Sequence, residues 1–162
     1  LFPYTTLFRS SDLIPGTHDL VAACRASGAC LAATTGYNRE MLDRVLAGAR
    51  AHGFEPAFAL SAEETAAGRP APWLIYRCME RAGVFPPAAV VKIGDTLPDI
   101  EAGLNAGVWT IGVAKTGNML GLDRQTVASL PPAELDERLD AACARMRAAG
   151  AHHVVEIGRA HV

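Results

Sequence analysis

The chain has 162 residues, of which half are apolar and a fifth are charged, as in one globular domain with a single core. Its formal net charge of −2 gives no electrostatic basis for binding nucleic acid or an anionic membrane. No apolar run approaches the roughly twenty residues that span a bilayer. The four cysteines form no Cys-x-x-Cys pair, which predicts reduced thiols in a cytoplasmic protein.

The two ends of the chain do not read as natural protein sequence. Residues 1–10 (LFPYTTLFRS) and the final IGRAHV resemble translated sequencing adapters. Glu156 could belong either to the natural region or to the C-terminal tail, and we count it with the tail. We therefore expect non-native tails at 1–10 and 156–162 and a natural region at 11–155 that is an internal piece of a longer gene.

Helical and strand patterns alternate along the natural region. The spacing of apolar residues and the Gly and Pro boundaries predict helices at 17–27, 38–52, 73–82, 98–106 and 132–149. Short apolar runs predict strands at 29–33, 58–60, 90–93, 108–113 and 153–155. This alternation predicts an α/β fold with a parallel sheet flanked by helices. Ligands of such sheets bind beyond the carboxyl ends of the strands.

The segment Gly94–Asp99 carries two carboxylates four residues apart. Asp95 follows a predicted strand and Asp99 lies in the first turn of the next helix. Carboxylates placed in this way suit Mg²⁺, which takes one or two protein carboxylates and a substrate phosphate oxygen. The structural alternative is that Asp95 caps the helix while Asp99 favours its positive N-terminal end.

Two further segments could hold a phosphoryl group. Thr34, Thr35 and Gly36 offer hydroxyls and free backbone N–H groups ahead of a helix, although they could form a plain turn. Arg69 lies just before the helix at 73–82 and could bind phosphate oxygens in a planar, bidentate way. Its structural alternative is a solvated arginine in a loop.

These three segments follow one another as motifs two, three and four of the haloacid dehalogenase superfamily do. The chain is therefore identified as resembling a Rossmann-like haloacid dehalogenase core. More closely, it resembles the phosphonoacetaldehyde hydrolase family. The segments that carry this resemblance are Thr34–Met41, Ala67–Trp73, Lys92–Thr96, Asn105–Thr110 and Gly150–His152.

The resemblance implies an enzyme that cleaves the carbon–phosphorus bond of a small-molecule phosphonate with Mg²⁺. In that family a lysine forms a Schiff base with the aldehyde and an aspartate takes the phosphoryl group. Asp95 would ligate Mg²⁺. Asp99 would support the ion site without binding the ion directly, or would hold the loop. Thr35, with Thr34 and Gly36, would bind phosphoryl oxygens. Arg69 would balance their charge, so Arg69 and Asp99 are the candidate catalytic residues.

The sequence departs from the family pattern at its start. The first strand with the nucleophilic aspartate and the cap domain with the Schiff-base lysine are expected to be missing. Asp12 lacks a preceding apolar strand, and neither Lys92 nor Lys115 matches the cap lysine. We therefore expect the chain as given to be inactive. We also expect it to be poorly soluble, because the strands beside the missing one would lose their partners.

Other functions remain open from the sequence. One is a generic Mg²⁺-dependent phosphatase or phosphomutase of the same superfamily, which would lack the Schiff-base lysine. Another is a non-catalytic, doubly wound binding module of the receiver or flavodoxin type. If the resemblance holds, the longer protein is expected to form a homodimer.

Overall fold

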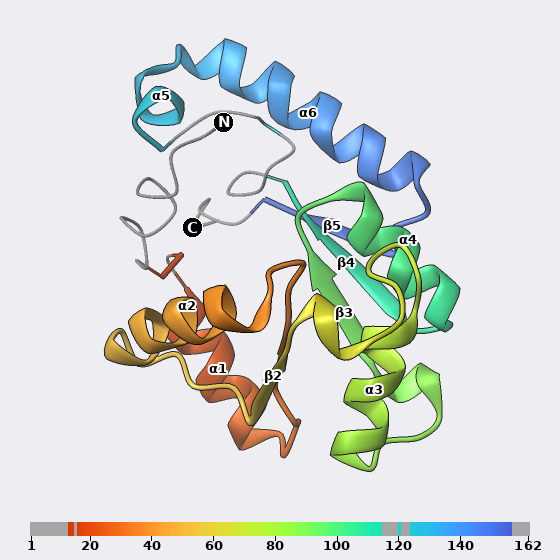
Figure 1. Cartoon of the computed structure of the whole chain (residues 1–162). Coiled ribbons are helices and arrows are strands. Elements are labelled where there is room, and N and C mark those ends of the chain that lie inside the picture. The colour runs from red at the N-terminus through yellow and green to blue at the C-terminus, as the bar shows by residue number, and fades with distance from the viewer. Residues whose placement is uncertain (1–12, 15, 115–119, 121–123, 157–162) are drawn as a thin grey trace. The chain divides into compact units, whose positions relative to one another are not determined.

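A computed structural model describes residues 13–14, 16–114, 120 and 124–156. The chain divides into two compact units, Leu1–Ala67 and Gly68–Val162, and each is described by itself below (Figure 1). The two predicted tails lie outside the described residues, except for Glu156. Asp12 and Lys115 also lie outside them.

The first unit is a small parallel α/β layer. Its elements are α1 (Thr17–Ala26), β1 (Ala32–Thr34), α2 (Arg39–Ala51), β2 (Phe58–Leu60) and the 3₁₀ turn η2 (Ala62–Glu64). β1 pairs with β2 in parallel, with Thr34 opposite Leu60. Helix α2 begins where the Asn38 side chain accepts a hydrogen bond from the Met41 N–H at 2.9 Å. Its inward face packs Leu42 and Leu46 against Ala59.

The second unit is built on a three-stranded parallel sheet of order β3-β4-β5. Its strands are β3 (Val91–Gly94), β4 (Trp109–Val113) and β5 (His153–Val155). Its helices are α3 (Trp73–Ala82), α4 (Leu97–Ala106), α5 (Arg124–Ser129) and α6 (Pro132–Ala148), with a 3₁₀ turn η3 (Pro87–Ala89). Gly94 pairs with Gly112, and Gly112 with Val154, so these residues share one face of the sheet.

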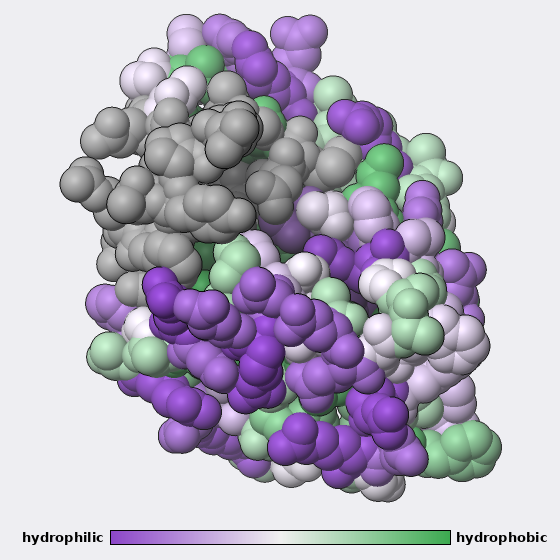
Figure 2. Space-filling view, in the orientation of Figure 1, coloured by the Kyte–Doolittle hydropathy of each residue, from purple (hydrophilic) through white to green (hydrophobic). Residues whose placement is uncertain are grey.

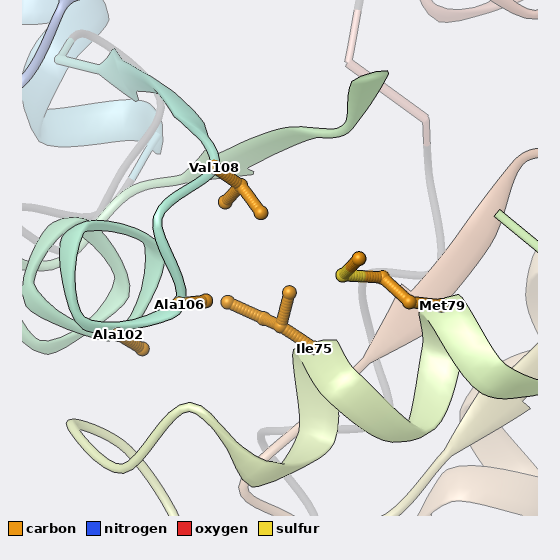
Figure 3. Close-up of a cluster of buried hydrophobic side chains, with 5 residues drawn as sticks. All are labelled: Ile75, Met79, Ala102, Ala106 and Val108. Carbon is orange, nitrogen blue, oxygen red and sulfur yellow. The ribbon is translucent and has the colours of Figure 1, made fainter. Parts of the chain in front are cut away.

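Helices α4 and α6 cover that face. Gly103 of α4 approaches Thr110 so closely that a Cβ at Gly103 would overlap the threonine methyl group. A Cβ at Gly112 would lie 2.6 Å from the Met146 sulfur of α6. Helix α3 packs in turn on α4, and Figure 3 shows Ile75 and Met79 pointing toward the residues that they meet. Those residues are Ala102, Ala106 and Val108.

The opposite face of the β3-β4-β5 sheet keeps large apolar side chains exposed. Val91, Ile93, Trp109 and Val155 are 41–51% exposed, although parallel sheets are usually covered on both faces. On the face drawn in Figure 2, hydrophilic residues predominate and apolar residues are scattered among them.

The predicted parallel α/β architecture is confirmed, with three differences in detail. Strand β1 begins at Ala32, so Cys30 precedes the strand and is exposed. Helix α5 and the turns η2 and η3 were not expected from the sequence. In the described part of the chain, β1-β2 and β3-β4-β5 form separate sheets, and the missing first strand stays a prediction.

The cysteines lie in environments that range from exposed to buried. All four cysteines are free thiols. Cys143 is buried, and burial raises the pKa of its thiol, which disfavours the reactive thiolate. Among the described residues, no helix combines the length and apolar character that crossing a bilayer requires.

Candidate phosphate and metal site

Asp99 lies at the centre of the charged cluster that follows β3. Its Oδ1 atom is 2.7 Å from Arg69 Nη1 and 2.8 Å from Lys92 Nζ. Its Oδ2 atom accepts a hydrogen bond from the Thr96 hydroxyl at 2.6 Å. One carboxylate therefore binds two cations and one hydroxyl, all within the second unit.

The Asp99 carboxylate is charged despite being buried. Its side chain is only 3% exposed, and burial alone would raise its pKa. The charge of Lys92 opposes this effect, as do hydrogen bonds from Lys92, Thr96 and Arg69, and together they lower the pKa of Asp99 to about 2. The cluster thus holds a permanent negative charge between two cations at neutral pH.

Local sequence explains how the cluster forms. Thr96 is the N-cap residue of α4, and Pro98 lies in the first turn, where its missing N–H costs nothing. Asp99 therefore points back toward β3 from the first turn of the helix. It has room there only because residue 94 is glycine: a Cβ at Gly94 would overlap Asp99 and lie 2.5 Å from its Cγ.

The loop that carries Arg69 is tied to α4 at a second point. The Asn105 side chain donates a hydrogen bond to the Pro70 carbonyl at 2.9 Å. Arg69 is thus held by the ion pair of its own side chain with Asp99 and by the hydrogen bond to the next residue, Pro70. Its side chain nevertheless remains 30% exposed.

Asp95 lies at the carboxyl end of β3, one residue before the helix cap. It is half-buried and takes part in a further interaction. Asp99 does not fit a direct metal-ligand role, because Arg69 and Lys92 share one of its oxygens and Thr96 occupies the other. Among the described residues, His, Cys, Asp and Glu form no group of three or more. Among the described residues of this cluster, Asp95 is the carboxylate that stays a candidate for Mg²⁺, which takes the rest of its ligands from water and phosphate.

The other predicted phosphate-binding residues lie in the first unit. Thr34 ends β1, and Thr35 and Gly36 follow it. The prediction of a free Thr35 N–H is wrong, because that group donates a hydrogen bond to the Leu60 carbonyl at 3.1 Å. The Thr35 hydroxyl accepts from the Tyr37 N–H at 3.2 Å and keeps its own proton to donate.

Ser61 is a residue that the sequence analysis missed. It directly follows β2, as Thr35 follows β1, and is fully buried. Its Oγ atom has no hydrogen-bond partner among the described residues, while its backbone N–H donates to Glu64 at 2.9 Å. Position at a strand end was the signal that could have identified it.

The geometry decides two of the structural alternatives. Arg69 is not a merely solvated loop residue, since it forms a short ion pair with a buried carboxylate. Asp95 is not the helix cap, since that position belongs to Thr96. Lys92 was expected only to lie within a strand. It does so, but its amine also reaches Asp99.

Comparison with known proteins identifies the family. The model of the haloacid dehalogenase-like hydrolases matches residues 3–107, which is more than half of the chain. The chain belongs to this family. The α/β fold expected for a haloacid dehalogenase-like hydrolase is the one observed.

Two curated relatives of this chain have names that refer to phosphonoacetaldehyde hydrolase. It is 44% identical over 93% of its length to a "phosphonoacetaldehyde hydrolase-like protein" of Syntrophobacter fumaroxidans, and covers 54% of that protein. It is 40% identical over 90% of its length to a "phosphonoacetaldehyde hydrolase" of Paraburkholderia xenovorans, and covers 55% of it. The chain thus spans about half the length of these relatives.

A solved structure agrees with the sequence comparison. The crystal structure of a phosphonoacetaldehyde hydrolase-like protein from Oleispira antarctica matches 94% of this haloacid dehalogenase-like hydrolase and 55% of its own chain. The TM-score is 0.90 at 34% sequence identity. The predicted resemblance to the phosphonoacetaldehyde hydrolases is therefore confirmed.

Proposed function

We propose that this chain supplies the phosphate-binding half of an enzyme that hydrolyses phosphonoacetaldehyde to acetaldehyde and phosphate. The names of its relatives support this substrate. The observation that carries the proposal is the Arg69–Asp99 pair, in which a buried carboxylate holds an arginine whose side chain is 30% exposed. A cation held in this way suits an anionic substrate.

The overall reaction breaks one carbon–phosphorus bond. Water supplies a hydroxyl group to phosphorus and a proton to carbon, and no oxidant or reductant is needed. As the bond breaks, its electron pair leaves with the carbon, which takes up the proton, while the phosphoryl oxygens carry negative charge throughout. Arg69 would bind these oxygens and neutralise part of this charge, which lowers the barrier most when the cation is already in place.

The remaining candidate residues have supporting roles in this proposal. The hydroxyls of Thr34 and Thr35 and the backbone at Gly36 would donate hydrogen bonds to phosphoryl oxygens. Asp95 would hold Mg²⁺, which neutralises charge on the phosphoryl group when bound. Asp99 would act by fixing Arg69 rather than by touching the substrate or the ion.

Reading the coding sequence that adjoins this chain in its source DNA tests the proposed substrate. An apolar strand ending in Asp-x-Ala-Gly-Thr, followed by a helical cap with a lysine, is the expected result. An Asp-x-Asp motif without a cap lysine would contradict it. That result would favour an ordinary phosphatase or phosphomutase of the same family, because no Schiff base could then activate the carbon–phosphorus bond.

A further inference from the structure

Thr96 does not use its hydroxyl as the N-cap residue of a helix usually does. A threonine at the N-cap normally accepts a hydrogen bond from the N–H of the second or third helical residue. The Thr96 side chain makes no such bond. The N–H of Asp99, the third residue of α4, donates instead to the Thr96 backbone carbonyl at 3.1 Å. The hydroxyl is therefore available for another partner.

That partner is the carboxylate of Asp99. The Thr96 hydroxyl donates to the Asp99 Oδ2 atom at 2.6 Å. Hydrogen bonds from a hydroxyl to a charged oxygen have lengths of about 2.5–2.7 Å and are stronger than those between neutral groups. The Asp99 side chain is 3% exposed, so little water competes for this bond. Thr96 thus fixes where the Oδ2 atom lies.

Both cations of the cluster bind the other oxygen of this carboxylate. Arg69 Nη1 and Lys92 Nζ lie 2.7 Å and 2.8 Å from Asp99 Oδ1. Two positive charges at one oxygen repel each other, and a cation that moved to Oδ2 would reduce this repulsion. The hydroxyl proton of Thr96 at Oδ2 opposes such a move. The place of Arg69 therefore depends on Thr96 as well as on Asp99.

We propose that Thr96 is a positioning residue whose hydroxyl, by holding Oδ2 of Asp99, keeps Arg69 at Oδ1. This inference rests on the proposed function, which assigns Arg69 to the phosphoryl oxygens and Asp95 to Mg²⁺. Thr96 directly follows Asp95 in the sequence. The two neighbouring residues thus connect the carboxylate assigned to the ion with the carboxylate that holds Arg69. Thr96 acts through Asp99 and does not itself bind the substrate.

The test uses the product of the full reading frame that contains this chain. Thr96→Val keeps the β-branched shape of the side chain and removes the hydroxyl. Calorimetric titration with inorganic phosphate in the presence of Mg²⁺ measures the affinity. We expect Thr96→Val to weaken phosphate binding by about tenfold, the equivalent of one charge-assisted hydrogen bond. Thr96→Ser keeps the hydroxyl and should restore most of the affinity.

A double-mutant cycle with Arg69→Met shows whether Thr96 acts through Arg69. Residues that act through one contact have effects that do not add. Thr96→Val should therefore change the phosphate affinity little once Arg69→Met is present. The same tenfold loss in both backgrounds would overturn the positioning role.

NMR of the arginine side chains provides a second measurement that needs no phosphate. The Nε and Nη signals of Arg69 should shift in Thr96→Val and return in Thr96→Ser. The matched control is Thr17→Val, which removes the hydroxyl that donates to the Ile14 carbonyl at 2.7 Å at the start of α1. This control should leave the Arg69 signals unchanged. If Thr96→Val does not fold, Thr96→Ala also lacks the hydroxyl and should shift them in the same direction.

The outcomes separate this inference from the proposed function. Arg69 signals that are the same in Thr96→Val and in the unsubstituted protein would overturn the positioning role. A phosphate affinity that Arg69→Met leaves unchanged would instead count against the proposed function. The NMR comparison without phosphate would still decide whether Thr96 holds Arg69 in place.

Discussion

Gly94 and Asp99 are in such close contact that the Asp99 side chain leaves no room for a side chain at residue 94. The Asp99 Oδ2 atom would lie 2.9 Å from a Cβ at residue 94. This contact joins the end of β3 to the first turn of α4 and fixes where the buried carboxylate lies. The positions of Arg69 and Lys92 then follow, because both bind that carboxylate.

Gly94→Ala is therefore expected to displace Asp99 and to lower the free energy of unfolding by about 1–3 kcal/mol, as overpacking does. Urea denaturation followed by circular dichroism measures this change. The control is Gly68→Ala, since a Cβ at Gly68 meets nothing within 4 Å. A Gly94→Ala chain as stable as the Gly68→Ala chain would refute the close contact.

Acid should weaken the fold through Asp99. In the folded chain its pKa is lowered to about 2, below the value of about 4 for an unfolded aspartate. The stabilisation is therefore fully present above pH ~4 and is lost as the pH falls toward ~2, and its size is on the order of 2 kcal/mol. Urea denaturation at a series of pH values measures it.

Asp99→Asn is the matched variant for this pH dependence. It should be less stable at neutral pH, because Lys92 and Arg69 lose the buried carboxylate that balances their charge. Its stability should then change less between pH 4 and pH 2 than that of the unsubstituted chain. Equal pH profiles for the two chains would show that another group is responsible.

His152, which directly precedes β5, is joined to Thr110 of β4 by hydrogen bonds that involve both side chains. Its Nδ1 atom accepts a hydrogen bond from the Thr110 N–H at 3.1 Å, and its own backbone N–H donates to Thr110 Oγ1 at 3.1 Å. Thr110 is fully buried, so His152→Leu leaves a buried N–H unpaired and should cost about 1–3 kcal/mol. Faster hydrogen exchange of the Thr110 amide would locate the effect. His153→Leu, at an exposed position, should leave that amide unchanged.

The exposed apolar face of the β3-β4-β5 sheet should promote self-association. Val91 is 51% exposed, and water-exposed apolar surface of this kind favours aggregation. Val91→Thr should therefore reduce concentration-dependent light scattering without much loss of stability. Val108→Thr, at a position only 2% exposed, should instead destabilise the chain. A chain that stays monomeric at high concentration with Val91 intact would contradict this reading.

The parallel α/β fold was predictable because the spacing of apolar residues agrees with the positions of Gly, Pro and cap residues along most of the chain. Helix α2 begins after Asn38 and α4 ends just before Gly107, as the cap residues indicated. Helix α5 was not predictable, because its six residues are too few to show a helical period. Strand β1 is three residues long, and apolar runs of that length do not locate their own boundaries.

The site was only partly predictable for a physical reason. Strand-end position and motif order identified Arg69, Asp95 and Asp99 as candidates. The sequence could not show that Asp99 binds Arg69 and Lys92 rather than a metal, because that depends on the contact between Gly94 and the first turn of α4. Lys92 was set aside as a strand residue, yet a charged residue inside an apolar strand was itself a signal that it needs a buried partner.

The most direct test is an assay of acetaldehyde and phosphate release from phosphonoacetaldehyde by the product of the full reading frame that contains this chain. Parallel assays use Arg69→Met and, as a control, Arg77→Met. We predict Mg²⁺-dependent turnover that Arg69→Met abolishes and Arg77→Met preserves. Turnover of phosphate esters but not of phosphonoacetaldehyde, or full activity in Arg69→Met, would contradict the account.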